Sequence, residues 1–367
     1  MAAASPRKAD FTVFFSFRFM AKANKRLSIA DLAQELGLSV STISRALNNA
    51  PDVSESTKAQ VWELARKLNF QPNNLAAALR SGRSNMLGVI VPHINGAFFP
   101  EVVHGIEAVA SKAGFNVMIC QSNEDVEQEK KHIDALLKAQ MDGILVSMSN
   151  TTLRFEHFEK VRQQAVPLVF FDRMPNLPQV CGVTVDDFRG AYQVMEHLLA
   201  QGCRRIAHLA GPQLLNTTFN RHRGYQEALQ AHGLPYDEEL VITLPKSSIE
   251  AGAAAMRQLL ALKERPDAVF SAYDFPAGGA LQVLEAQGIR VPEDLALAGF
   301  SNEPFTTMVK PQLTSVDQRG QQMGETAVQL LLQVLKRTDT YVGQRIVLKP
   351  KVIIRDSSRH AHPVSRE

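Results

Sequence analysis

The chain has 367 residues, of which 45% are hydrophobic and 21% charged, so it exceeds one ordinary domain and has the composition of a soluble globular protein. Its three cysteines are odd in number and show no CxxC spacing, which excludes a disulfide framework or a typical zinc site and favours a reducing cytoplasm. The net charge of +3 is uneven: residues 1–84 hold 12 Lys/Arg against 6 Asp/Glu, and the remainder holds 28 against 31. A basic head on a nearly neutral body suits contact with phosphates.

The first residues contain an aromatic run, FTVFFSFRF, from Phe11 to Phe19. It could be a signal-peptide core, a membrane segment or a tail. The run is too short to span a bilayer, Arg18 interrupts it, and no small-residue cleavage site follows. We therefore expect residues 1–26 to form a disordered extension, with Met20 as an alternative start.

A first short helix is predicted after Ser28, which has Asp31 three residues later, as in a capping box. Its apolar residues follow the i, i+3, i+4, i+7 spacing of one helix face: Ile29, Leu32, Ala33 and Leu36. Gly37 ends this helix, and a second helix follows a tight turn. Helix, short glycine-containing turn and helix together indicate a helix-turn-helix unit.

The second helix is expected to bury Ile43, Ala46 and Leu47, and a third helix capped by Ser54 supplies a surface for packing. The early residues of the second helix would enter the major groove, with Val40, Ser41 and Arg45 facing the bases. Counting caps and neighbours, the wider set expected to contact DNA in this unit is Ser28, Ser39, Val40, Ser41, Thr42, Ser44, Arg45 and Asn48. The alternative is a small helical bundle with an ordinary polar face.

The connector after Pro72 is short, alanine-rich and basic. From here the chain closely resembles the lactose-repressor/galactose-repressor family of bacterial transcription regulators, over about residues 27–355. The matching motifs occur in fixed order: VSTISRALNN, PNNLAAAL and LGVIVPHINGAFF. The resemblance implies a helix-turn-helix domain at 27–74 and a hinge helix at 75–84. Leu79 would wedge between base steps in the minor groove and Arg80 would contact that groove, unless Leu79 is a core residue of a linker helix.

Beyond residue 85 apolar runs alternate with amphipathic helical stretches, which predicts parallel sheets covered by helices on both faces. The expected strands are Met86–Val91, Val117–Cys120, Gly143–Ser147, Leu168–Phe171, Ile206–Ala210, Ala268–Ser271 and Leu295–Phe300. The helices expected between and after them are Glu101–Ala113, Glu127–Ala139, Phe188–Gln201, Arg221–Ala231, Pro276–Gln287 and Gly320–Leu335.

The family resemblance implies that these elements form an α/β, periplasmic-binding-protein-like effector domain (85–355) with two subdomains. The N-subdomain is placed at about 85–186 and 318–338, and the C-subdomain at about 187–316 and 343–355. The strand Arg345–Leu348 is thus assigned to the C-subdomain, and residues 356–367 to a flexible tail. That tail holds His360 and His362, which we interpret as disordered rather than metal-binding.

An effector is expected in the cleft between the subdomains, beyond the carboxyl ends of the strands. Phe98 and Phe99 offer rings to stack on an apolar ligand face, although such a pair also commonly fills a core. Asp172 would hold a ligand hydroxyl or pair with Arg173. By resemblance, Thr217 and Arg221 also contact the effector, and a guanidinium suits vicinal hydroxyls or a carboxylate.

Two departures from the family pattern occur in the expected cleft. Tyr273-Asp274 stands where the family usually has Asn-Asp, and Ser301-Asn302 replaces its Asp-Asp pair. Ser301 cannot accept two hydrogen bonds as an ionised carboxylate does. The loss makes an anion held by Arg173 and Arg221 more attractive than a simple neutral hexose, so the effector is predicted as a sugar, sugar acid or related metabolite.

Two alternatives to a transcription regulator are an enzyme and a pure ligand-binding protein. An enzyme could pair carboxylates among Asp172, Asp186 and Asp274, since glycoside hydrolysis needs only two, but no nucleophile elbow, HExxH, P-loop or GxGxxG motif occurs. A pure ligand-binding protein would lack the basic head and carry an export signal. We therefore predict a cytoplasmic homodimer without cofactor or metal, nucleoid-associated when it binds a palindromic operator and switched by its effector. No heptad pattern supports a tetramer.

Overall fold

The computed structural model describes residues 27–70, 83–177, 179–336 and 343–359. The chain divides into two compact units, residues 1–81 and 82–367. The predicted N-terminal extension, most of the predicted hinge helix with Leu79 and Arg80, and the two tail histidines His360 and His362 lie outside the described residues. Those interpretations remain predictions.

The first unit is a bundle of three helices, as predicted: α1 (Ile29–Leu36), α2 (Val40–Leu47) and α3 (Glu55–Lys67). Ser28 and Asp31 form the expected capping box at the start of α1. Gly37 ends that helix with φ +64°, a left-handed conformation that glycine adopts without a steric penalty. All three helices contribute to one small core, which includes Leu32, Ile43 and Val61.

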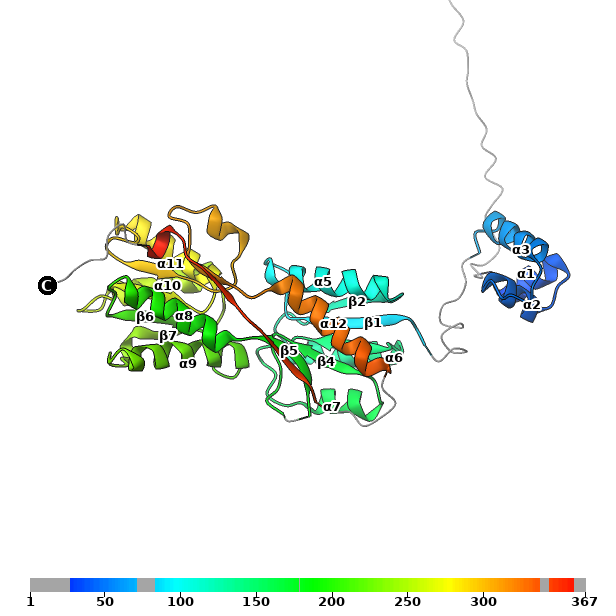
Figure 1. The fold of residues 1–367 in the computed structure, drawn as a ribbon, viewed down its shortest axis with the longest axis horizontal. Coiled ribbons are helices and arrows are strands. Elements are labelled where there is room, and N and C mark those ends of the chain that lie inside the picture. The colour runs from blue at the N-terminus through cyan, green and yellow to red at the C-terminus, as the bar shows by residue number, and fades with distance from the viewer. Residues whose placement is uncertain (1–26, 71–82, 178, 337–342, 360–367) are drawn as a thin grey trace, which may run out of the picture. The chain divides into compact units, whose positions relative to one another are not determined.

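The second unit begins with a six-stranded parallel sheet in the order β11-β5-β4-β3-β1-β2 (Figure 1). Its strands are β1 (Met86–Val91), β2 (Asn116–Gln121), β3 (Gly143–Val146), β4 (Leu168–Phe171), β5 (Cys181–Val185) and β11 (Arg345–Leu348). The inner strands are buried apolar runs, as expected when helices cover both faces of a parallel sheet.

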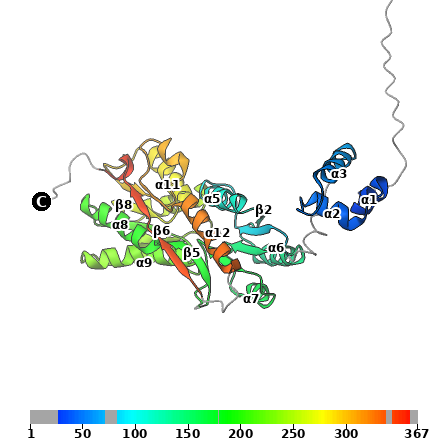
Figure 2. The same cartoon turned by 45° about the vertical axis from the view of Figure 1, so that its right-hand side comes forward.

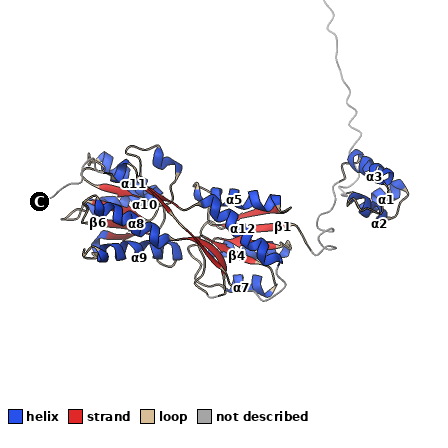
Figure 3. Ribbon diagram, viewed as in Figure 1, coloured by secondary structure: helices blue, strands red, loops and turns tan. Residues whose placement is uncertain are grey.

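Helices cover both faces of this sheet, which Figure 3 shows in blue over red strands. One face packs on α5 (Phe98–Lys112) and α12 (Gly320–Lys336), and the other on α6 (Val126–Lys138) and α7 (Glu156–Gln163). Helices α5 and α12 approach closely at two glycines. A Cβ atom on Gly324 would lie 2.0 Å from the Val102 carbonyl oxygen, so only glycine fits at that crossing.

A second parallel sheet, in the order β7-β6-β8-β9, forms the other half of the unit. Its strands are β6 (Ile206–Ala210), β7 (Val241–Thr243), β8 (Ala268–Ser271) and β9 (Ala296–Ala298). Its covering helices are α8 (Asp187–Ala200) and α9 (Asn216–Ala231) on one face, and α10 (Ile249–Leu260) and α11 (Asp274–Ala286) on the other. The two-sheet α/β fold predicted from the strand and helix alternation is confirmed.

The chain passes between the two sheets at three places, visible in Figures 1 and 2. The first passage joins β5 to α8, and the second joins β10 (Ser315–Asp317) to α12. The third follows β11, because β11 pairs in parallel with β5 and the next strand, β12 (Lys351–Ile353), pairs antiparallel with β10. We call the half built on the first sheet the N-subdomain and the half built on the second sheet the C-subdomain.

The assignment of Arg345–Leu348 to the C-subdomain is therefore wrong, since this strand completes the N-subdomain sheet. The predicted tail also starts too early. Residues Asp356–Ser358 form a short 3₁₀ helix in which Ser357 and Ser358 are fully buried, and the Ser357 hydroxyl donates to the Leu297 carbonyl at 2.6 Å. The polar composition of this segment suggested a flexible tail, but its serine hydroxyls are hydrogen-bonded in the interior and hold it in place.

Two further 3₁₀ turns, Glu238–Leu240 and Pro304–Thr307, complete the described elements. Among the described residues, no helix is long and apolar enough to cross a membrane.

Candidate functional site

The first turn of α2 presents a polar, accessible surface on the helical unit. The Ser39 hydroxyl caps the helix by accepting from the Thr42 amide at 3.1 Å, and it lies 2.7 Å from the Ser41 hydroxyl. Val40 is 52% exposed, and Ser41 is also exposed. A short capped helix with hydroxyls and an apolar side chain at its accessible start has the chemistry that base edges and thymine methyls require.

The exposed side of α2 continues at Arg45, one turn after Ser41. Its guanidinium forms an ion pair with Asp52, and both side chains are about half exposed. A surface pair of this kind is weak, so Arg45 can exchange Asp52 for an external acceptor at little cost. Asn48 is exposed, and its side-chain amide donates to the Ser44 carbonyl at 2.8 Å.

Ser44 does not belong to the exposed set that the sequence predicted. It is buried, because the eight-residue helix α2 packs against both α1 and α3 and therefore covers more than one stripe of its surface. Ser28 and Ser39 are exposed but already serve as helix caps. The structure thus places Val40, Ser41, Thr42 and Arg45 on the accessible side of α2.

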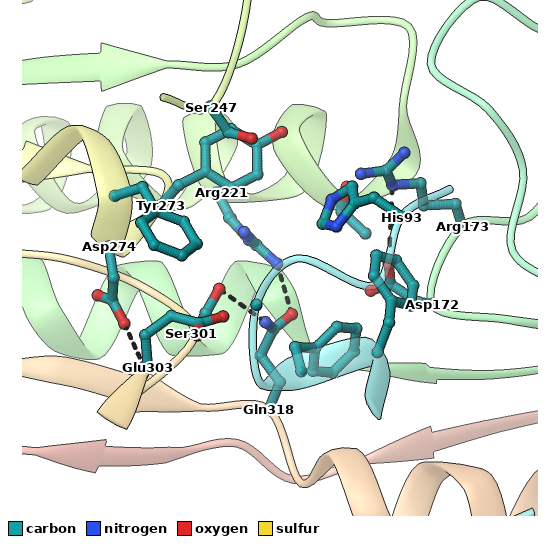
Figure 4. A pocket seen from close by; sticks show the side chains of 15 residues that line it. His93, Asp172, Arg173, Arg221, Ser247, Tyr273, Asp274, Ser301, Glu303 and Gln318 are labelled. Carbon is teal, nitrogen blue, oxygen red and sulfur yellow. Dashed lines mark hydrogen bonds and ion pairs between the residues drawn. The ribbon is translucent and has the colours of Figure 1, made fainter. Parts of the chain in front are cut away.

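In the larger unit, a cleft that is partly open to solvent lies between the two subdomains (Figure 4). The structure brings all nine predicted effector residues to its wall: Phe98, Phe99, Asp172, Arg173, Thr217, Arg221, Tyr273, Asp274 and Ser301. The lining residues that the sequence reasoning missed are His93, Gly96, Ser247, Phe275, Glu303 and Gln318.

Arg221, on α9, lies in the wall with every side-chain nitrogen engaged. Its Nε donates to Asp187 Oδ1 at 2.8 Å, Nη1 to the Ala272 carbonyl at 2.7 Å, and Nη2 to Gln318 Oε1 at 2.7 Å. The guanidinium also lies 3.8 Å from the centroid of the Phe300 ring. Arg221 is therefore a buried residue that holds Asp187, Ala272 and Gln318 in place by hydrogen bonds, and Asp187 balances its charge.

Arg173 is likewise paired, though not chiefly with its neighbour Asp172. Its Nη1 lies 2.8 and 2.9 Å from the two carboxylate oxygens of Glu124, whereas Nε is 3.7 Å from Asp172 Oδ2. Asp172 has φ +58°, a left-handed conformation that Asp tolerates better than most residues. Burial raises the pKa of Asp172, against the opposing effect of Arg173.

Asp274 serves the loop that follows β9 rather than the open space of the cleft. Its Oδ2 accepts from the Glu303 amide at 2.8 Å, and its Oδ1 accepts from the Ser315 hydroxyl at 2.6 Å. Burial raises the pKa of Asp274 to about 6, against these stabilising bonds. Ser301 accepts at 2.9 Å from the Gln318 amide, which links it to Arg221 in one hydrogen-bonded chain.

Two side chains of the C-subdomain reach across to the N-subdomain. The Asn216 amide donates to the Asp172 carbonyl at 3.0 Å and its oxygen accepts from the Met174 amide at 3.0 Å. Glu303 Oε2 accepts from the Ala97 amide at 2.8 Å. The side chains around the cleft can therefore respond to the angle between the subdomains.

Of the three carboxylates considered for acid/base chemistry, Asp172 and Asp274 line the cleft. Asp186, the third carboxylate, lies outside the lining and caps α8 by accepting from the Arg189 amide. Within the described ranges, no group of three or more His, Cys, Asp or Glu side chains is arranged to hold a metal ion.

Comparisons with known protein families agree with this geometry. The model for "Bacterial regulatory proteins, lacI family" matches residues 28–73, and that for a periplasmic binding protein-like domain matches residues 195–358. The ribose operon repressor of Halalkalibacterium halodurans is 31% identical over 336 residues, covering 90% of this chain and 97% of that protein. The chain belongs to the lacI family. The predicted resemblance is thereby confirmed.

Other lacI-family proteins match over a similar extent. The repressor CytR of Escherichia coli is 33% identical over 341 residues, covering 92% of this chain and 99% of that protein. A complex of the regulator CelR with cellobiose matches with a TM-score of 0.69 at 30% identity, covering 90% of this chain and all of that one. A lac repressor dimer bound to operator gives 0.81 at 25%, covering 91% and 99%. These relatives are transcription regulators, and this lacI-family member is one as well.

Two cleft residues of this lacI-family protein, Gln318 and Glu303, were not predicted, although their positions after strands could have indicated them. Gln318 directly follows β10, and Glu303 lies in the loop after β9, so the rule that ligands bind beyond strand ends applied to both. Asp187 and Glu124 do not line the cleft. They pair with Arg221 and Arg173, and nothing in the local sequence indicates these two ion pairs.

Proposed function

We propose that this chain is a homodimeric repressor that reads an operator through the first turn of α2 and responds to a small polyhydroxylated ligand in the subdomain cleft. The observation that carries the proposal is the presence, in one chain, of a capped α2 with Val40, Ser41 and Arg45 exposed and of a separate compact unit with a polar cleft. The helical unit contacts DNA, and the larger unit binds an effector.

The chemistry of the cleft supports a ligand with several hydroxyl groups and at least one apolar face. Phe98, Phe99 and Phe275 supply rings, and Asp172, Ser301 and Gln318 supply polar atoms. Carbohydrates combine both features. Among the relatives, one is named for the ribose operon and one was solved with cellobiose, which supports the same ligand class here.

The predicted anion held by Arg173 and Arg221 finds little support in these contacts. Glu124 and Asp187 already balance the two guanidiniums, so neither offers a free fork to an external carboxylate. We infer that the arginines orient the polar wall, and that the ligand contacts hydroxyl, amide and carboxylate groups held in place by them.

A homodimer is supported by the free edge of the N-subdomain sheet. Strand β2 lies at this edge, and its Met118 and Ile119 side chains are 41% and 50% exposed. An edge strand with exposed apolar residues is a ready surface for a second copy. A two-fold dimer would present two α2 helices to the two halves of a palindrome.

Regulation follows if the effector favours one angle between the subdomains. A ligand shifts such an equilibrium only through unequal affinity for the two states. Asn216 and Glu303 make hydrogen bonds that exist only when the subdomains are close. Closing or opening the cleft therefore makes or breaks hydrogen bonds between the two subdomains.

The proposal is tested by selecting binding sites from a random duplex library with the full chain. We expect a palindromic consensus, and a screen of neutral sugars should then find one that changes the affinity for this duplex at least tenfold. A selection that recovers no sequence preference would contradict the operator-reading role. An enriched duplex whose binding no polyhydroxylated ligand alters would contradict the effector role of the cleft.

A further inference from the structure

The start of α5 opens onto the cleft, and a carboxylate of the protein itself occupies it. Helix α5 has 15 residues, and its N-cap residue, Ala97, makes no side-chain hydrogen bond to the first amides. Gly96 and Phe98, on either side of its N-cap residue Ala97, both line the cleft. Free amides at the N-terminus of a helix favour negative charge, so this position would suit an anionic group of a ligand.

Glu303 fills that position from the opposite subdomain. Its Oε2 accepts from the Ala97 amide at 2.8 Å, and its side chain is buried. A Cβ atom on residue 96 would lie 3.0 Å from Glu303 Oε1, so the glycine leaves room for the carboxylate to approach. The Glu303 carboxylate therefore lies against the backbone at the start of α5 through both of its oxygens, Oε2 at the Ala97 amide and Oε1 beside Gly96.

The loop that carries Glu303 is fixed rather than free to swing away. The Glu303 amide donates to Asp274, and the Glu303 carbonyl accepts from the Thr306 hydroxyl at 2.6 Å. Arg355 Nη2 donates to the adjacent Asn302 side chain at 2.6 Å. A ligand anion would have to displace a carboxylate that its own loop holds in place.

The charges around the cleft act in the same direction. Three carboxylates line it, on Asp172, Asp274 and Glu303, together with the guanidiniums of Arg173 and Arg221. Both guanidiniums are paired with carboxylates of residues outside the lining. A ligand therefore meets acidic groups without a free compensating cation among the described lining residues.

We propose that Glu303 is a specificity-determining residue that occupies the N-terminus of α5 and thereby excludes anionic ligands, so that the effector is uncharged. This inference rests on the proposed effector role of the cleft and narrows its ligand class. Sugar phosphates and sugar acids are rejected because their anionic group and the Glu303 carboxylate compete for the Ala97 amide at the start of α5.

The test compares the full chain with three variants. Glu303→Gln removes the charge and keeps the shape, whereas Glu303→Ala also frees the Ala97 amide. Glu101→Gln is the matched control, because Glu101 lies in the first turn of the same helix but outside the cleft lining. The probes are inorganic phosphate, ribose 5-phosphate and ribose, measured by thermal shift and by titration calorimetry.

We expect phosphate and ribose 5-phosphate to bind Glu303→Ala at least about tenfold more tightly than the native chain, with a smaller gain for Glu303→Gln. The Glu101→Gln variant should behave as the native chain does. Phosphate that binds the basic DNA-binding unit appears equally in all four proteins and cancels. If Glu303→Ala does not fold, the comparison of Glu303→Gln with the native chain decides the question.

The inference is overturned if the native chain binds ribose 5-phosphate as tightly as the folded Glu303 variants do, or if Glu101→Gln gains as much as they do. The proposed function has a separate readout, namely release of the selected operator by a neutral ligand. A gain in phosphate binding without any such release would support the role of Glu303 and contradict the effector role of the cleft.

Discussion

Arg221 and Asp187 form an ion pair inside the C-subdomain, with Nε and Nη2 of the arginine each 2.8 Å from Oδ1 of the aspartate. The two side chains are only 3% and 1% exposed. Burial raises the pKa of Asp187 to about 7, against the opposing charge of Arg221. Because Asp187 starts α8 directly after the first passage between the subdomains, the pair ties the cleft wall to that passage.

Arg221→Met should destabilise the larger unit, because it leaves the Asp187 carboxylate buried without its partner. A loss of roughly 3 to 5 kcal/mol in the free energy of unfolding is expected from urea denaturation. The double variant Arg221→Met, Asp187→Leu should recover a large part of that loss. A single variant as stable as the native chain would show that the pair contributes nothing to stability.

The stability of the larger unit should decrease as the pH rises from about 4 to 7, because the pKa values of both Asp187 and Asp274 are raised; the part due to Asp274 can be isolated. The pKa of Asp274 is about 6 in the folded chain against an ordinary value of 3.8, so the folded state retains a proton that the unfolded state releases. This contribution is complete below pH 3.8 and disappears as the pH rises through 6, with a size of up to about 3 kcal/mol.

Asp274→Asn should weaken this dependence, because the asparagine does not titrate and its amide can donate to the Ser315 hydroxyl while its oxygen accepts from the Glu303 amide. Denaturation curves recorded at pH 4, 5, 6 and 7 give the slopes to be compared. Substitution of the half-exposed Asp134 by Asn serves as the control. An unchanged slope in Asp274→Asn would assign the pH dependence to other groups.

Arg45→Ala should weaken binding to the selected operator by about 1 to 3 kcal/mol, with little change on random duplex, if its guanidinium reads a base. Fluorescence anisotropy on both duplexes measures the ratio of the affinity for the operator to the affinity for random duplex. Arg66→Ala is a suitable control, since Arg66 is an exposed arginine in the last turn of α3. Equal losses of Arg45→Ala on both duplexes would indicate a phosphate contact instead.

Ile119→Glu should shift the protein from dimer to monomer in sedimentation velocity and lower operator affinity in parallel. A charge on the β2 edge would be buried without a partner in the dimer. Val347→Glu is the matched control, because Val347 is 58% exposed on β11 at the opposite edge of the same sheet. A dimer that persists in Ile119→Glu would place the interface elsewhere.

The strands and helices could largely be predicted because their apolar residues follow simple periods. The run Leu168–Phe171 and the helix face of Ile29 and Leu32 are examples. The sheet that a strand joins is a different matter. Arg345–Leu348 alternates like any edge strand, and its pairing with Cys181–Val185 is a long-range contact that local pattern does not encode.

For the cleft, residues directly after strands were predictable because parallel strands end at one edge. What they contact was not predictable. The sequence suggested that Arg221 could bind a ligand anion. Its actual partners, Asp187 and Gln318, lie 34 and 97 positions away along the chain, so the local sequence does not reveal them. Ser301 was predicted to accept fewer hydrogen bonds than a carboxylate; that one of them comes from Gln318 could not be predicted.

The segment from β11 to the last 3₁₀ helix has a consequence for biosynthesis. Residues 345–358 supply an edge strand to one sheet, the partner of β10, and hydroxyl anchors beneath β9. Neither subdomain can reach its final packing while these residues are still missing from the growing polypeptide. The two halves must therefore mature together late in translation, and a nonsense mutation before codon 345 would leave both incomplete.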